Sequence, residues 1–176
     1  RNHSSAASDV YKRQVEEQTK MKDIYADLIS KIQRDEQDFR SHIQLAQLYM
    51  LEARVTGEHG HYYPAALSIL NKLLSSAPPK DAKFGALSLK ASVYLSLHRF
   101  PEAKAIAEEA VSLNSYNALI YGSLVDANVE LGDYTTAIEM ADKMVEIRPD
   151  LRSYSRVSYL RDCLLYTSDA ADEWLR

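Results

Sequence analysis

Apolar and small residues between positions 80 and 149 recur along the chain with a period of 34 residues. A shift of 34 places seven positions of one unit over seven of the next, and only Asn128 breaks the chemical match. The breaker pairs His98-Arg99 and Gly132-Asp133 also align, between two stretches with helical spacing. Each unit is therefore predicted to be a helix, a tight turn and a second helix. The aligned pairs are Leu87 and Tyr121, Ala91 and Val125, Tyr94 and Asn128, Phe100 and Tyr134, Ala103 and Ala137, Ala107 and Ala141, and Ala110 and Met144.

The same pattern extends in both directions and predicts units at residues 38–79, 80–115 and 116–149. In the earliest unit the connection between helices, TGEHGHYYP, is expected to be about eight residues longer than in the others. LRSYSRVSYLRD within residues 150–162 predicts the first helix of a further unit. Residues 15–37 predict one amphipathic helix, because apolar residues recur there at helical spacing. The tyrosines in repeat register are expected in the core: Tyr49, Tyr94, Tyr121, Tyr134 and Tyr154.

These units resemble the tetratricopeptide repeat, which pairs an aromatic and a small residue in its first helix with alanines in its second. The resemblance implies an all-α fold, an α-solenoid of helix-turn-helix repeats. Small residues such as Ala103 and Ala137 would let the two helices of a hairpin approach closely.

The resemblance also implies a function: a scaffold without catalysis, which binds a peptide or a partner protein on the concave face lined by the first helices. Some tetratricopeptide domains grip a chaperone's C-terminal carboxylate with Lys, Arg and Asn from successive first helices. Only Arg152 and Arg156 fit such a clamp, so chaperone-tail binding is not favoured, and the pattern favours a solvated helix face for this pair. The expected groove residues are Arg40, Ile43, Gln47, Ser88, Ser92, Asp126, Arg152, Arg156 and Tyr159.

An alternative is that this region is the accessory part of a larger enzyme or of a membrane-anchored protein whose active part lies elsewhere. The sequence contains no glycine-rich phosphate loop and no nucleophile elbow, and no cofactor is expected.

Glu58, His59 and His61 form the one cluster with metal-ligand chemistry. Imidazole and carboxylate groups suit zinc, but a stable site needs a further ligand that the spacing does not supply. We interpret the histidines as exposed residues of a loop that recognises a partner, and we expect no metal site.

The chain has 21 basic and 25 acidic residues and a net charge of −4, mixed along its length. This balance offers no electrostatic surface for nucleic acid. No apolar run approaches the roughly 20 residues needed to cross a bilayer, so direct membrane insertion by this region is not expected.

The two ends of the chain are related to each other in an unusual way. SSAASDVYKRQ at residues 4–14 and CLLYTSDAADE at residues 163–173 can be encoded by the two strands of one short DNA, each read in frame. This relation resembles translated sequencing-adapter DNA, so we interpret residues 1–14 and 163–176 as an artefact. The interpretation predicts a bacterial, metagenomic fragment whose natural chain continues beyond both ends. The only cysteine, Cys163, then lies outside the natural chain, and thiol chemistry is not expected.

Overall fold

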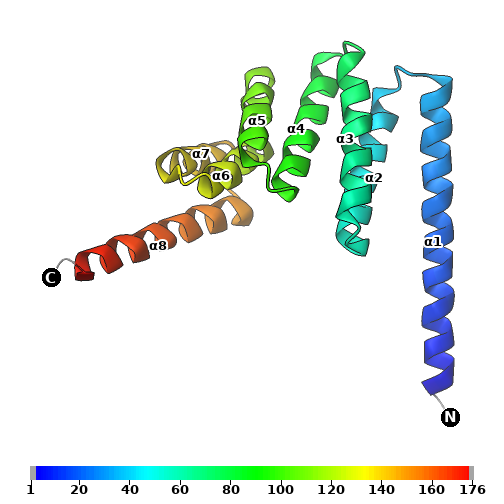
Figure 1. The fold of residues 1–176 in the computed structure, drawn as a ribbon, viewed down its shortest axis with the longest axis horizontal. Helices are drawn as coiled ribbons and strands as arrows, with labels where there is room; N and C mark the ends of the chain where they lie inside the picture. Colours follow the sequence, from blue (N-terminus) through cyan, green and yellow to red (C-terminus); the bar gives the residue numbers. More distant parts are fainter. Residues whose placement is uncertain (1–2, 175–176) are drawn as a thin grey trace. The chain divides into compact units, whose positions relative to one another are not determined.

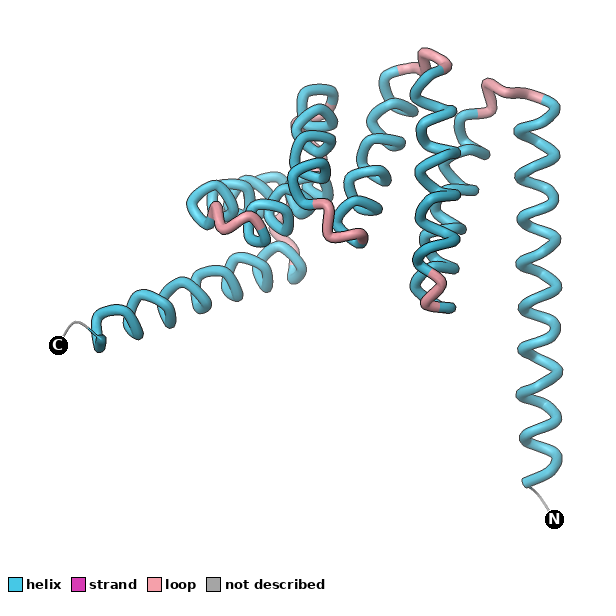
Figure 2. Tube along the Cα trace, in the orientation of Figure 1, coloured by secondary structure: helices cyan, strands magenta, loops and turns pink. Residues whose placement is uncertain are grey.

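The computed structural model describes the backbone of residues 3–174 and the side chains of residues 19–162. The side chains of the two terminal segments lie outside the described residues, so their adapter origin stays a prediction. The described backbone contains helices and no strand, which confirms the all-α fold (Figures 1 and 2). The helices are α1 (His3–Arg34), α2 (Phe39–Thr56), α3 (His59–Ser75), α4 (Lys80–Ser96), α5 (Phe100–Leu113), α6 (Ala118–Glu130), α7 (Tyr134–Ile147) and α8 (Leu151–Trp174).

The chain divides into two compact units, Arg1–Pro78 and Pro79–Arg176. In the first unit, α2 and α3 form a hairpin that buries Leu45 and Leu70. Helix α1 packs on α2 through Leu28 and Ile32, which join Leu45 in one hydrophobic cluster. The unit is thus held by apolar burial, worth about 1.5–3 kcal/mol for each large side chain that is fully buried.

The predicted long connection in this unit is wrong, because only Gly57 and Glu58 separate α2 from α3. Gly57 adopts a left-handed conformation, with φ of 75°, and its N–H donates to the Ala53 carbonyl to close α2. The N–H groups of His61 and Tyr62 both donate to the Glu58 carbonyl and begin α3. The additional residues therefore lengthen the two helices of the hairpin.

In the second unit, α4 with α5 and α6 with α7 form two further hairpins, and α8 packs against α7. The alanines of the second helices are buried as expected from the repeat pattern: Ala103, Ala107 and Ala110 on α5, and Ala137 and Ala141 on α7. Methyl side chains at these positions allow close approach of neighbouring helices. On α8, Leu160 packs into a cluster with Val125 and Ala141.

The 34-residue period reappears in the backbone of the two turns that close α4 and α6. His98 has φ of 57° and Gly132 has φ of 76°, so both occupy the left-handed region that ends many helices. The two turns share three N–H to carbonyl bonds at the same relative positions. Donor first, they are Leu97 to Val93, His98 to Leu95 and Arg99 to Tyr94, then Leu131 to Ala127, Gly132 to Val129 and Asp133 to Asn128.

Two of the tyrosines expected in the core are exposed. Tyr134 is 47% and Tyr154 is 53% exposed, whereas Tyr121 is buried at 5%. Tyr134 is the first residue of α7, where the helix has just begun. On α8 the buried face carries Ser153 and Leu160, seven residues apart, so Tyr154 points about 100° away from it.

Candidate functional site

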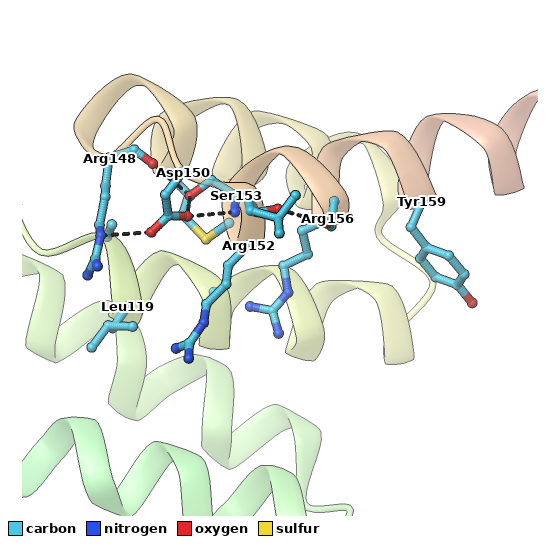
Figure 3. A pocket seen from close by; sticks show the side chains of 12 residues that line it. Leu119, Arg148, Asp150, Arg152, Ser153, Arg156 and Tyr159 are labelled. Atoms are coloured by element: carbon cyan, nitrogen blue, oxygen red, sulfur yellow. Dashed lines mark hydrogen bonds and ion pairs between the residues drawn. The ribbon is translucent and has the colours of Figure 1, made fainter.

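A pocket of about 680 Å³ lies in the second unit, between the start of α6 and the first turns of α8 (Figure 3). Three arginines line it together with apolar and small residues. The lining residues are Ala118, Leu119, Gly122, Met144, Arg148, Asp150, Leu151, Arg152, Ser153, Ser155, Arg156 and Tyr159.

The start of α8 is fixed by Asp150 and Ser153. The Asp150 carboxylate accepts the Ser153 N–H at 3.0 Å, which caps the first turn of the helix. The buried Ser153 hydroxyl donates to the Arg148 carbonyl at 2.7 Å. The Ser153 N–H, and the Ser153 hydroxyl at 3.0 Å, both donate to the Asp150 carboxylate and lower the pKa of Asp150. The arrangement orients the helix face that carries Arg152 and Arg156.

Arg156 extends from α8 to α6, where its Nη2 lies 2.8 Å from Oδ2 of Asp126. Its guanidinium passes over Gly122, and a Cβ at that position would collide with Nη1 of Arg156. The absence of a side chain at Gly122 therefore makes the ion pair possible. Burial raises the pKa of Asp126, and the nearby Arg156 opposes that rise.

The remaining charges leave a positive surplus at Arg152. Arg148 pairs with Asp150 at 2.8 Å. Arg152 is exposed, and its guanidinium makes no ion pair with the part of the chain whose side chains are described. Because Arg152 and Arg156 are four residues apart, they leave α8 on one face, as Figure 3 shows. An anionic group of a ligand would meet Arg152 first.

Apolar side chains border this cationic centre and are open to solvent. Leu119 is 65%, Leu151 is 83% and Tyr159 is 66% exposed. A cationic pocket with exposed apolar neighbours suits a segment that alternates acidic and apolar side chains. Nothing in this donor set resembles a catalytic acid–base pair or nucleophile with its base.

The pocket brings together three of the residues expected in the groove, Arg152, Arg156 and Tyr159, and Asp126 joins them through its ion pair. Ser88 and Ser92 are half-buried on α4 and do not line it. Their hydroxyls donate to carbonyls of their own helix, at 2.8 Å to Phe84 and at 3.2 Å to Ser88. Such back-bonding satisfies the hydroxyls within α4.

Arg40, Ile43 and Gln47 lie on α2, in the other compact unit. Arg40 is exposed and Ile43 is partly buried. Gln47 borders a separate groove of about 590 Å³ between α1 and α2, together with Leu48 and Leu51. The membership of these three residues in one binding face with the α8 arginines stays a prediction.

Sequence reasoning missed Arg148 and did not recognise the role of Gly122. Arg148 directly precedes Pro149, where one unit ends and the next helix begins. This position at the junction of two units is the sequence feature that could have indicated Arg148 as a pocket residue.

The histidines near Glu58 are occupied with aromatic neighbours. The His59 ring lies 5.3 Å from the Tyr63 ring, and the His61 ring lies 4.9 Å from the Tyr62 ring in an edge-on contact. Both histidines are exposed at the start of α3 and not in a loop. Among residues 19–162, no three His, Cys, Asp or Glu side chains gather as metal ligands would.

The helices within the described part of the chain include none with an apolar stretch long enough to span a bilayer.

The geometry described so far defines an all-helical repeat fold of stacked hairpins. The family profile of the tetratricopeptide repeat matches residues 118–151, which include α6 and α7. This match assigns residues 118–151 to a tetratricopeptide repeat, within a chain whose described backbone is an all-helical repeat fold. A search of curated proteins finds no significant match.

Solved structures share the fold at low sequence identity. The crystal structure of MamA superposes with a TM-score of 0.65 and 17% identity, over 84% of this chain and 81% of MamA. MamA from residue 41 to its end, from Desulfovibrio magneticus RS-1, gives 0.66 and 17%, over 99% of this chain and 93% of that one. The first tetratricopeptide domain of Spaghetti (RPAP3), bound to the HSP90 peptide SRMEEVD, gives 0.56 and 20%, over 69% and 97%. The repeat fold supports a protein-interaction module.

Proposed function

We propose that the second unit binds an acidic, extended segment of a partner protein in the pocket between α6 and α8, without catalysis. The observation that carries this proposal is Arg152, an exposed arginine without an ion pair in the described chain, one turn from Arg156. Arginine binds carboxylates through two parallel hydrogen bonds, which gives it both affinity and orientation.

The apolar rim supports the same ligand class. Leu119 and Leu151 flank the arginines and offer surface to apolar side chains on either side of an acidic residue. A related fold bound to the peptide SRMEEVD shows that a tetratricopeptide domain can hold a segment with adjacent glutamates. Residues of α6 and α8 would therefore recognise acidic side chains.

The free C-terminus of a partner is not the expected anchor. A carboxylate clamp draws cationic and amide side chains from successive first helices, whereas here both arginines come from α8. The helix α4 contributes serines whose hydroxyls are already bonded within the helix. Acidic side chains within a segment should therefore matter more than its terminal carboxylate.

A binding assay with three labelled peptides tests this function. The peptides are SRMEEVD with a free C-terminus, the same peptide amidated, and the amidated peptide with both glutamates changed to glutamine. We expect the first two to bind about equally and the third about tenfold more weakly, as loss of charged hydrogen bonds predicts. Arg152→Glu should weaken the first two to a similar degree.

Arg161→Glu is the matched control, because Arg161 also lies on α8 but pairs with Asp142 at 3.1 Å, away from the pocket. Circular dichroism should show unchanged helicity for both variants. Equal affinity of the wild type and Arg152→Glu for the amidated peptide would refute the site.

A further inference from the structure

A second site lies on the opposite face of α6, at Asn128. This side chain is fully buried, at 0% exposure. Its Nδ2 donates to the Leu124 carbonyl at 2.8 Å, but its Oδ1 has no hydrogen-bond partner in the described structure. A buried acceptor without a donor costs stability, so such a group calls for an explanation.

The preceding repeat carries a tyrosine at the equivalent position. Tyr94 stands 34 residues before Asn128, and both carbonyls accept the same turn hydrogen bond, from Arg99 and Asp133 respectively. The Tyr94 ring is covered by the Arg99 guanidinium at 4.6 Å and by the Lys90 ammonium at 5.8 Å. Asparagine at the same backbone position is smaller and lacks the ring.

A pocket of about 520 Å³ lies between α5, α6 and α7, and Asn128 is one of the residues that line it. Its apolar lining comes from Val111, Leu124 and Met140. Met140 is unbranched and flexible, so it is the wall that can move to admit a ligand to the buried amide. Tyr121, which also lines the pocket, already donates its hydroxyl to the Ser115 carbonyl at 3.1 Å and does not serve Asn128.

The rim of the pocket carries acidic side chains. Glu108 of α5 and Glu139 of α7 are both exposed there. The one basic residue of the rim, Lys143, is paired with Glu146 at 2.7 Å. The rim therefore favours a ligand with basic groups on either side of its inserted part.

We propose that this pocket receives a tyrosine side chain of a partner protein, presented by a segment with flanking Lys or Arg residues. The ring fills the space that Tyr94 fills in the preceding repeat. The phenol hydroxyl donates to Oδ1 of Asn128, and the flanking cations face Glu108 and Glu139. Phenylalanine lacks the donor, and a phosphorylated tyrosine is repelled by the acidic rim. The site is separate from the arginine pocket, because positions 122 and 126 lie on the face of α6 opposite to Asn128.

Two amidated and acetylated tripeptides, Lys-Tyr-Arg and Lys-Phe-Arg, test the proposal by NMR titration. The signals to follow are the Met140 methyl group and the Asn128 side-chain amide. The tyrosine peptide should bind about five- to tenfold more tightly than the phenylalanine peptide, as one buried hydrogen bond predicts. Failure of the wild type to bind either peptide, or equal affinity for both, overturns the proposal.

Three variants test the mechanism. Asn128→Tyr fills the pocket from within and should abolish binding of both peptides, while Asn128→Leu keeps an apolar floor and should remove the preference for tyrosine. If Asn128→Tyr folds and binds the tyrosine peptide like the wild type, the pocket is not the site. Glu108→Lys with Glu139→Lys changes only exposed residues, so it should fold, and it should weaken the tyrosine peptide at least fivefold. Unchanged affinity in this charge-reversed variant also overturns the proposal. The acidic peptide should bind the Asn128 variants as it binds the wild type, so failure at one pocket is distinguishable from failure at the other.

Discussion

Gly122 and Arg156 are sterically coupled: the guanidinium of Arg156 occupies the space where any side chain at position 122 would begin. The next nearest atoms, Cζ of Arg156 and Sδ of Met144, lie at an ordinary contact distance of 3.6 Å. A methyl group therefore fits at position 122 if Arg156 moves, and the end of an arginine side chain moves easily.

Gly122→Ala is expected to keep the fold and displace Arg156 from Asp126. Alanine is about 1 kcal/mol better than glycine inside a helix, so stability should rise slightly or stay the same. The affinity for the acidic peptide should change, because Arg156, one of the two arginines that face the ligand, has moved. The NMR signal of the Arg156 Nε–H reports the displacement. Gly60→Ala is the control, since a methyl group there meets no atom within 4 Å; a similar change of binding in both variants would contradict the coupling.

Asp126→Asn should strengthen binding of the acidic peptide by about two- to threefold, because Asp126 competes with the ligand for Arg156. Burial raises the pKa of Asp126, so the fold disfavours its ionised form. Removing the carboxylate charge by Asp126→Asn should therefore not reduce stability at pH 7. Peptide affinity and thermal unfolding measured on the same sample test both parts. Weaker binding by Asp126→Asn would show that the ion pair orients Arg156 for the ligand.

Three aspartates at helix starts should make stability depend on pH. Each of Asp38, Asp133 and Asp150 accepts a backbone N–H, from Ser41, Thr136 and Ser153 respectively. The hydroxyl of the same residue, together with this N–H, lowers the pKa of each aspartate; the hydroxyl has the larger effect at Asp38 and Asp133, and the N–H has the larger effect at Asp150. A lowered pKa in the fold stabilises the protein above the ordinary carboxyl pKa of about 3.9, and the effect disappears as pH falls below it. The melting temperature should therefore hold from pH 7 to 5 and fall below pH 4.

Replacing all three aspartates with asparagine separates this effect from other acid effects. Asparagine also caps helices well, so the variant should melt within a few degrees of the wild type at pH 7. As the pH falls, the melting temperature of the variant should decrease less steeply than that of the wild type. Identical acid profiles for the two proteins would show that the caps contribute nothing measurable to the pH dependence.

The two left-handed turn residues should respond to substitution in opposite directions. Gly132→Ala places a Cβ at φ of 76° and should cost about 1 kcal/mol. His98→Gly relieves the same conformation at φ of 57° and should gain about 0.5 kcal/mol. This gain is smaller than the cost of Gly132→Ala because His98→Gly also removes the ring contact of His98 with Phe100, at 5.6 Å. Urea unfolding of both variants measures the change in the free energy of unfolding. Changes of the same sign in the two variants would contradict the left-handed conformation of these residues.

Much of the fold was predictable because packing repeats the sequence pattern. The aligned alanines Ala103 and Ala137 had to be small for neighbouring helices to approach, and both are fully buried. The long connection was mispredicted because glycine and histidine clusters suggest a loop. Gly57 instead ends α2, and α3 begins two residues later. Tyr63, which is 3% exposed, packs the first part of α3 into the core.

The candidate site was predictable only in part. Arg152 and Arg156 were expected together because residues four apart share a helix face. The ion pair between Arg156 and Asp126 joins residues thirty positions apart, and the sequence does not show that their side chains meet. Ser88 and Ser92 illustrate the opposite case: they occupy groove positions by register, but their hydroxyls turn back to their own helix.

The three matching hydrogen bonds after α4 and α6 mean that each turn is closed by residues of its own repeat. A 34-residue cassette copied from residues 116–149 and inserted after Pro149 would therefore carry its own closing bonds. Gene duplication could lengthen such a protein without redesigning any junction, and an engineer could use the same route to add binding surface one hairpin at a time.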